Sequence, residues 1–298
     1  PFYLIALAVI VVGYGSAVLS MRERAGQEAL RLEAVADLKL GQISAWLSER
    51  RADARSLAGD PGLVQLYERW AHQADTRAKT QLLERLEAVR HAYGYVRLGL
   101  LDEHGETVLA TTELIQASPG LRAQVSRALR EHAVVESDFY RFGDQPEAPP
   151  MLDFVAPLSV PQGGTPLAVI LQVDPNAYLY AYLQGWPAPS RSAETLLVRR
   201  DGKDLLFLTP LRHEAAPALT RRMPADQANL LGAQLLNETD RRGRVVKALD
   251  YRGVPVVGVG RRVPGTDWLL VVKMDQDEVQ EASSHQLWWI LLAVGAAL

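Results

Sequence analysis

The stretch DYRGVPVVGVGRRVPGTDWLLVVKMD, residues 250–275, decides the fold that we predict. It contains two apolar runs, PVVGVGRRV and DWLLVVKMD, with the turn residues PGT between them. Apolar and β-branched runs bounded by proline and glycine are typical of the two strands of a β-hairpin. The hairpin comes only a few residues before an uncharged C-terminal segment. We therefore expect a β-sheet close to a membrane span.

The same pattern occurs earlier in the chain. VAPLSVPQGGTPLAVILQVD (155–174) can be laid beside VVGVGRRVPGTDWLLVVKMD (256–275), because each has a strand, a Gly-Thr turn, an apolar strand and a final Asp. A hairpin precedes each of them, and the second hairpin has an Asp201–Gly202 turn, a strong two-residue turn signal. We interpret the two halves as an internal repeat of one α+β module, with chance similarity of two β-rich segments as the alternative.

A long helix is predicted ahead of both halves. Residues 21–58 contain no proline and only two glycines. Apolar residues recur there at helical spacing, at Leu40, Ile43, Leu47, Ala54 and Leu57. Such a helix would be ~55 Å long.

The sequence AGDPG (58–62) predicts a corner after this helix. We expect Gly59 to end the helix in a left-handed conformation, with Asp60 and Pro61 starting the next one. A second helical region is predicted from Leu63 to about His91, with a break near 73–76. Helical material is also expected around Ala225–Leu231.

Both ends of the chain are uncharged and apolar. Phe2–Leu19 is long enough to cross the ~30 Å hydrocarbon core of a bilayer. Leu287–Leu298 is shorter, and Trp288 and Trp289 at its start are typical of a membrane interface. Since the chain begins with Pro1, we expect a piece of a longer protein that stops inside a second span. A cleaved signal peptide is the alternative for the first segment.

Composition and motifs argue against several classes of function. The chain has 32 Lys and Arg against 35 Asp and Glu, a net charge of -3, so no nucleic-acid partner is expected. The absence of cysteine excludes cysteine–zinc sites and thiol nucleophiles. No Walker loop, HExxH, GxSxG or dinucleotide fingerprint is present, and the six histidines are scattered. We therefore predict no enzymatic activity, metal or cofactor for this chain.

The chain resembles the double Cache family of extracytoplasmic sensor domains. The resemblance rests on GQISAWLSERRADARSLAGDP, SDFYR, LDFVAPL, DPNAYLYAYLQGWPAPSRSAETLLVRRDGKDLLFL and the opening stretch. It implies an α+β fold, in which one long N-terminal helix carries two tandem PAS-like antiparallel-sheet modules between two transmembrane helices. It also implies that the membrane-distal module holds a ligand and that the proximal one passes the change on.

The expected domain limits follow from these patterns. They are transmembrane helix 1 (1–20), the long helix and second helical region (21–93), the distal module (94–185), a linker (186–193), the proximal module (194–275), and the exit helix with transmembrane helix 2 (276–298).

Six polar residues of the distal module are candidates for ligand binding. In a PAS-like module, the loop that contains SDFYR borders the pocket. Tyr95 and Arg97 are expected on one face of the first strand, and a carboxylate between Leu152 and Phe154 must be paired, hydrated or functional. The candidates are Tyr95, Arg97, Asp138, Tyr140, Arg141 and Asp153. The alternative is a structural salt bridge, with Arg97 or Arg141 as the partner of Asp153.

Both signs of charge among these residues favour a small polar or zwitterionic metabolite or a carboxylate as the ligand. The matching positions of the proximal module look more apolar, so we expect no specific ligand there. A homodimer through the long helix is expected, with residues 21–285 on the periplasmic side of the inner membrane.

The function that we predict is ligand sensing for a transmembrane receptor, with a sensor histidine kinase as the expected output. The same sensor on a diguanylate cyclase, a phosphodiesterase or a chemoreceptor is the alternative. Two alternatives come from other functional classes: a ligand-free dimerisation scaffold at the membrane surface, and a membrane-anchored enzyme.

Overall fold

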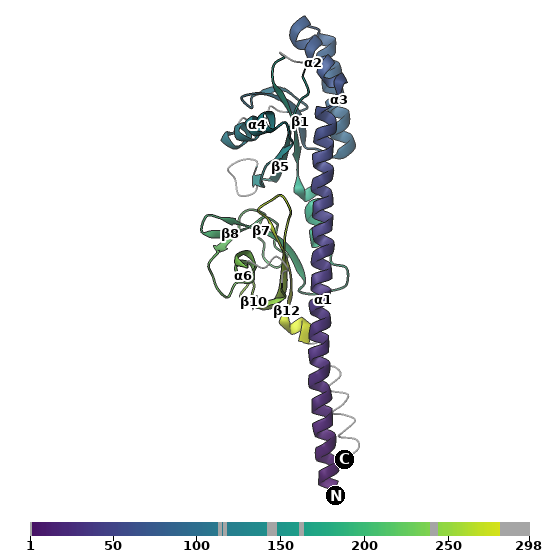
Figure 1. The fold of residues 1–298 in the computed structure, drawn as a ribbon, viewed down its shortest axis with the longest axis vertical. Helices are drawn as coiled ribbons and strands as arrows, with labels where there is room; N and C mark the ends of the chain where they lie inside the picture. Colours follow the sequence, from purple (N-terminus) through teal and green to yellow (C-terminus); the bar gives the residue numbers. More distant parts are fainter. Residues whose placement is uncertain are drawn as a thin grey trace. The chain divides into compact units, whose positions relative to one another are not determined.

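The computed structural model describes residues 2–112, 115, 118–141, 148–160, 164–238 and 244–280, with side chains from residue 26 onward. It divides the chain into two compact units (Figure 1). We call residues 43–181 the first module, and residues 2–42 together with 182–280 the second module.

Three helices begin the chain: α1 (Phe2–Ala58), α2 (Pro61–Gln73) and α3 (Thr76–Tyr93). The predicted long helix is confirmed as part of α1, and the predicted break lies between α2 and α3. The corner is also confirmed, because the Asp60 carboxylate accepts a hydrogen bond from the Gly62 N–H at 2.9 Å and Pro61 is the first residue of α2.

The predicted left-handed conformation of Gly59 is wrong. Gly59 is not among the residues with positive φ, and its N–H donates to the Arg55 carbonyl at 2.9 Å, as in a continuing helix. Left-handed caps instead follow the next two helices, at Ala74 (φ 53°) after α2 and at Gly94 (φ 70°) after α3.

The first module is an antiparallel sheet between two helices (Figure 1). On one face, Val155 and Ile170 of the sheet pack with Val125 of α4. On the other, the Phe154 ring meets the Trp46 ring of α1 edge-on, with centroids 6.4 Å apart. The sheet order is β2-β1-β6-β5-β3, and β4 pairs with β5. The elements are β1 (Arg97–Asp102), β2 (Thr107–Ala110), α4 (Pro119–Glu131), β3 (Val135–Glu136), β4 (Tyr140–Arg141), β5 (Pro150–Pro157) and β6 (Leu167–Val173).

A short helical segment follows this sheet. It comprises η1 (Pro175–Ala177) and α5 (Leu179–Gln184). The Asp174 carboxylate accepts from the Asn176 N–H at 2.8 Å and caps η1.

The second module repeats this topology. Its sheet order is β10-β11-β12-β7-β8-β9, which contains the order of the first sheet with β9 added beyond β8. The predicted repeat is therefore confirmed at the level of topology, and residues 250–275 contain the β11–β12 hairpin, in which Val256 pairs with Asp275. The elements are β7 (Glu194–Asp201), β8 (Asp204–Phe207), β9 (Arg222–Pro224), α6 (Leu231–Asn237), β10 (Val246–Leu249), β11 (Pro255–Arg262) and β12 (Leu269–Asp275), before a helical turn at 276–280.

The helix predicted around Ala225–Leu231 begins only at Leu231. Arg222–Pro224 pairs with β8 as β9, and the Ala225 N–H donates to the Lys203 carbonyl at 2.9 Å. These backbone groups are used by the sheet, so the helix starts later.

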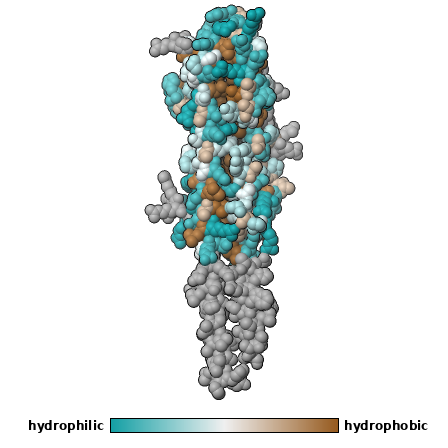
Figure 2. Space-filling view, turned by 90° about the vertical axis from the view of Figure 1, so that its right-hand side faces the viewer, coloured by the Kyte–Doolittle hydropathy of each residue, from teal (hydrophilic) through white to brown (hydrophobic). Residues whose placement is uncertain are grey.

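Residues of α1 before Ile43 are anchored within the second module. The Arg261 Nε donates to the Asp37 carboxylate at 2.6 Å, and the buried Lys39 ammonium donates to the Tyr182 and Gly185 carbonyls. Apolar residues lie mainly in the two cores, and hydrophilic residues cover most of the described surface in Figure 2.

Within the part of the chain that the structure describes, no helix has both the length and the apolar content needed to cross a membrane. The predicted first span falls where only the helical backbone of α1 is described. The predicted second span, 287–298, lies outside the described residues.

We expect Gly99→Ala to destabilise the first module. A Cβ at Gly99 would lie 2.8 Å from the Leu109 carbonyl oxygen and 3.1 Å from Ile115 Cδ1. Forcing a methyl group into a packed site of this kind costs about 1–3 kcal/mol. The matched control is Gly120→Ala in α4, where the nearest atom would be Ser118 Oγ at 3.7 Å. Thermal unfolding by circular dichroism tests this, and equal midpoints for the two variants would contradict it.

Candidate functional site

A polar row crosses three neighbouring strands of the first module. Arg97 on β1 pairs in register with Gln172 on β6, and Gln172 pairs with Asp153 on β5. Side chains in one register row of a sheet point to the same face. Val155 and Ile170 lie on that face and pack against α4. The polar row therefore continues an otherwise apolar surface covered by α4.

Neutral donors hold the Asp153 carboxylate. The Tyr140 hydroxyl donates to Asp153 Oδ1 at 2.9 Å, and Gln172 Nε2 donates to the same oxygen at 3.0 Å. Gln172 Nε2 also donates to the Tyr140 hydroxyl at 2.9 Å. The Asp153 N–H donates to Ser137 Oγ at 2.8 Å, which fixes the loop before Tyr140 against β5.

Burial dominates the electrostatics of this carboxylate. Asp153 is only 4% exposed, and burial raises its pKa to about 6, although the hydrogen bonds from Tyr140 and Gln172 and the charge of Arg97 act in the opposite direction. Burial also raises the pKa of Tyr140, and the neighbouring Asp153 charge adds to that effect. Tyr140 is therefore a neutral hydrogen-bond donor, and Asp153 titrates close to neutral pH.

A cavity of about 470 Å³ opens beside Asp153. Pockets for small ligands commonly measure ~300–1,000 Å³. Asp153 and Gln172 of the polar row line the cavity, together with residues of α4 and of the β3–β4 loop. The lining residues are Ile115, Ser118, Gly120, Leu121, Gln124, Ser137, Asp138, Phe139, Tyr140, Arg141, Asp153 and Gln172.

Four of the six predicted residues line this cavity: Asp138, Tyr140, Arg141 and Asp153. Arg97 is not in the lining, but its charge acts on Asp153 and Tyr140. The structure does not bring Tyr95 to the cavity. β1 begins only at Arg97, and the Tyr95 hydroxyl donates to the Asp53 carboxylate of α1.

Among the lining residues that the sequence did not predict, Gln172 and Ser137 form hydrogen bonds with Asp153. Gln172 is the single polar residue of LAVILQV, and this was a usable signal. Its partner on β5 depends on the sheet register, which the local sequence does not contain.

A larger cavity of about 1040 Å³ lies elsewhere in the first module. Its lining includes Arg55, Arg130 and His132, which are exposed, and Arg51, whose guanidinium is paired with the Glu136 carboxylate at 2.5 Å. These charges are hydrated or neutralised, whereas Asp153 is buried. We therefore place the candidate site at the smaller cavity.

No group of three or more His, Cys, Asp or Glu side chains that could hold a metal ion is found among the described residues. A carboxylate, a phenol, an amide and a guanidinium face a partly apolar cavity.

No protein-family model matches the sequence, and no curated protein matches it either. Solved structures do match. The extracellular domain of the putative histidine kinase vpHK1S-Z8 is 16% identical with a TM-score of 0.59, and the match covers 88% of this chain and 98% of that one. The ligand-binding domain of the Pseudomonas fluorescens chemoreceptor CtaA, in complex with L-isoleucine, is 13% identical with a TM-score of 0.57, covering 88% and 98%.

A domain of a putative sensory box/GGDEF family protein from Vibrio parahaemolyticus is 17% identical with a TM-score of 0.55, covering 87% of this chain and 99% of that one. All three similarities extend over both sheets and lie at identities where the fold is the common feature. With its long first helix and two sheets of the same topology, the chain has the fold of the double Cache sensor domains, as the sequence resemblance predicts.

Proposed function

We propose that this chain is the ligand-sensing part of a transmembrane receptor and that the first module binds the ligand in the cavity beside Asp153. One observation carries the proposal. A carboxylate that is 4% exposed and has a pKa of about 6 faces a cavity of about 470 Å³. Burying an ionised carboxylate is costly unless a cation or strong donors compensate it. A ligand cation in the cavity would provide that compensation.

The lining favours a zwitterionic ligand. An ammonium group would meet Asp153 and the Tyr140 hydroxyl, and the Arg141 guanidinium offers an opposite charge for a carboxylate. Ile115, Leu121 and Phe139 give apolar contact to a side chain between them. L-Isoleucine, which is bound in the similar chemoreceptor domain, has this chemistry. We therefore propose an amino acid or a related amine-containing carboxylate.

We further propose that residues 21–285 are periplasmic, between two spans of the inner membrane. The similar structures belong to a histidine kinase, a chemoreceptor and a GGDEF protein, and these classes define the candidate outputs. A sensor histidine kinase is the output that we propose.

The exposed face of α1 supports a homodimer. Leu30 is 67% exposed and Leu38 is 53% exposed, whereas Leu32, Val35 and Ala36 between them are buried in the second module. Ala34 and Gly41 also lie on the exposed face. Residues 34, 38 and 41 follow the 4–3 spacing of a coiled-coil seam, so we propose that this face pairs with its copy.

An amino-acid ligand should stabilise the chain through Asp153 and Arg141. A panel of L-amino acids is screened by thermal shift, and a ligand at 100 times its Kd should add about 2.7 kcal/mol. Asp153→Asn and Arg141→Gln should each weaken the hit about 10–100-fold, because a charge-assisted hydrogen bond contributes ~1.5–3 kcal/mol.

The control for this screen is Glu131→Gln, an exposed carboxylate at the end of α4 in the same module. A hit that persists in both site variants, or that is lost only in a second-module variant such as Arg252→Ala, would place the site elsewhere. A panel without any hit would favour the ligand-free scaffold.

Asp153→Asn should stabilise the unliganded chain at neutral pH. The pKa of Asp153 is raised from 3.8 to about 6, so the folded state holds the proton more tightly than the unfolded chain does. This favours folding at low pH, and the advantage is lost as pH rises through about 6, which costs about 3 kcal/mol at pH 8. The free energy of unfolding of the variant should exceed that of wild type at pH 8 and equal it near pH 4. A constant difference across this range would refute the assignment.

Single cysteines along Glu28–Leu40 should crosslink with helical periodicity. The chain has no cysteine of its own, so each introduced thiol reports only its own position. Crosslinking should peak at Ala34 and Leu38, which lie on the exposed face, and be weak at Val35 and Ala36, which are buried. Uniform crosslinking along the segment would argue against a parallel helix pair.

A further inference from the structure

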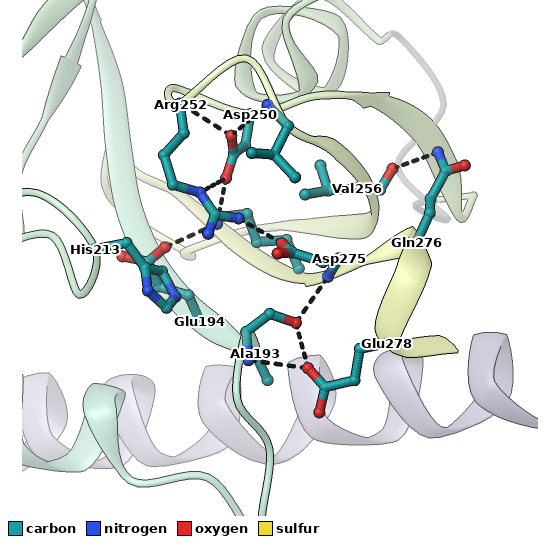
Figure 3. A network of polar contacts seen from close by, with 12 residues as sticks. Ala193, Glu194, His213, Asp250, Arg252, Val256, Asp275, Gln276 and Glu278 are labelled. Carbon is teal, nitrogen blue, oxygen red and sulfur yellow. Dashed lines mark hydrogen bonds and ion pairs between the residues drawn. The ribbon is translucent and has the colours of Figure 1, made fainter. Parts of the chain in front are cut away.

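The second module buries a charged cluster on its sheet (Figure 3). Lys273 on β12 is 1% exposed and pairs in register with Glu194 on β7. Its ammonium lies 2.8 Å from Glu194 Oε2 and 2.7 Å from Asp250 Oδ2. The expectation that this module is more apolar at these positions is therefore wrong. The two carboxylates come from β7 and from the turn before β11, so the local sequence around Lys273 contains no sign of them.

The cluster gives the ammonium a complete set of partners. Besides the two carboxylates, the Tyr251 ring lies under it, 4.9 Å from Nζ to the centroid. The Tyr251 hydroxyl donates to Glu194 Oε1 and Oε2 at 3.1 and 3.0 Å, and the Arg212 N–H donates to Glu194 Oε1 at 2.7 Å. Burial raises the pKa of Asp250, but the hydrogen bond and charge of Lys273 and the hydrogen bonds from Arg252 outweigh this and hold the pKa below its usual range.

Lys273 occupies the place that Gln172 has in the first module. Each lies on the strand that comes last in its module along the chain, two residues before an aspartate, Asp174 just after β6 and Asp275 at the end of β12. Each pairs with the first residue of the first strand, Glu194 for Lys273 and Arg97 for Gln172. Each also meets a tyrosine from the segment before the neighbouring strand, Tyr251 in one module and Tyr140 in the other.

The positions of Lys273 and Gln172 differ in the size of the cavity next to them. The cavity next to Lys273 measures about 10 Å³, barely enough for one water molecule, against about 470 Å³ beside Gln172. Gly258, the partner of Lys273 on β11, has no side chain, and a Cβ there would lie 2.5 Å from Leu231 Cδ2. Leu231 of α6 therefore packs directly on the strand and closes the site.

We infer that the second module contains a binding site for a primary ammonium group that is permanently occupied by the side chain of Lys273. Two carboxylates and an aromatic face are the groups that recognise an alkylammonium ion. Lys273 supplies this ion from within the chain, so the module has an internal ligand and stays closed without an external one. This goes beyond the proposed function, because it concerns another module and another ligand.

The occupied site is linked to the C-terminal helical turn (Figure 3). Arg252 Nε donates to Asp250 Oδ2 at 2.7 Å, and its other end donates to the Asp275 carboxylate. The Asp275 N–H donates to Ser192 Oγ at 3.0 Å, and the Ser192 hydroxyl and N–H donate to the Glu278 carboxylate. The internal ligand thus helps to fix the residues that lead to the C-terminal segment.

Chemical rescue tests the inference on the full chain. Lys273→Ala removes three methylene groups and the ammonium, which together are n-propylammonium. The vacated site should bind that ion, so n-propylammonium chloride should saturably raise the melting temperature of Lys273→Ala and restore hydrogen-exchange protection of β12. If this variant does not fold alone, folding itself should become dependent on n-propylammonium, measured by circular dichroism.

Three controls make the result decisive. Neutral n-propanol and sodium chloride at equal ionic strength should not rescue Lys273→Ala. Lys273→Met refills the stem without the charge, so it should lose stability and not respond to n-propylammonium. Lys203→Ala removes an exposed lysine of the same module and should leave both the melting temperature and the amine response at wild-type values. Rescue by n-propanol equal to that by n-propylammonium, or no rescue of Lys273→Ala, would overturn the inference.

Discussion

Placing the Asp153 carboxylate on the buried face of a sheet costs free energy, and the first module is arranged around that cost. Tyr140 and Gln172 offer it neutral donors, which do not cancel its charge. Its pKa, raised to about 6, shows that these interactions do not fully offset the cost of burying the ionised carboxylate. Close packing of α4 on Val155 and Ile170 covers that part of the sheet, and the cavity of about 470 Å³ lies beside Asp153 and Gln172 of the polar row. A buried carboxylate that a cationic group of a bound ligand can neutralise is a physical basis for ligand-dependent stability.

The two modules have the same topology, but they stabilise the buried polar groups on their sheets in different ways. In the first, the central position of the row is the neutral Gln172, and the space beside it is open. In the second, the same position is Lys273, whose ammonium forms ion pairs with the carboxylates of Glu194 and Asp250. Removing any one partner from a buried charge cluster of this kind leaves the others uncompensated and is strongly destabilising. On the proposed function, the first module responds to a solute, and the second keeps the structure that its internal charge cluster specifies.

The repeat, the hairpins and the start of α2 could be predicted because they depend on local patterns. Turn residues and apolar periodicity predicted the hairpins, and the Asp60–Pro61 pair predicted the start of α2. Predictions failed where long-range pairing decides. Arg222–Pro224 joins β8 and delays α6, and Tyr95 turns to Asp53 of α1 instead of continuing β1. Asp153 was visible as a lone carboxylate in an apolar strand, whereas Gln172 and Lys273 gain their roles only from register partners.

The helix α1 contributes residues to both compact units, and each unit holds its own part of the helix with polar contacts. Ser137 in the cavity lining accepts the Asp153 N–H, and its neighbour Glu136 holds Arg51 of α1 through two hydrogen bonds. Earlier on the same helix, Asp37 is bound by Arg261 of β11. The backbone of α1 is helical throughout from Phe2 to Ala58 and contains no proline. A helix held by its own hydrogen bonds resists local bending unless proline, glycine pairs or a bulge interrupt it. Arg51 and Asp37 therefore lie on one uninterrupted helix, and each is held by a partner from its own unit, Glu136 for Arg51 and Arg261 for Asp37.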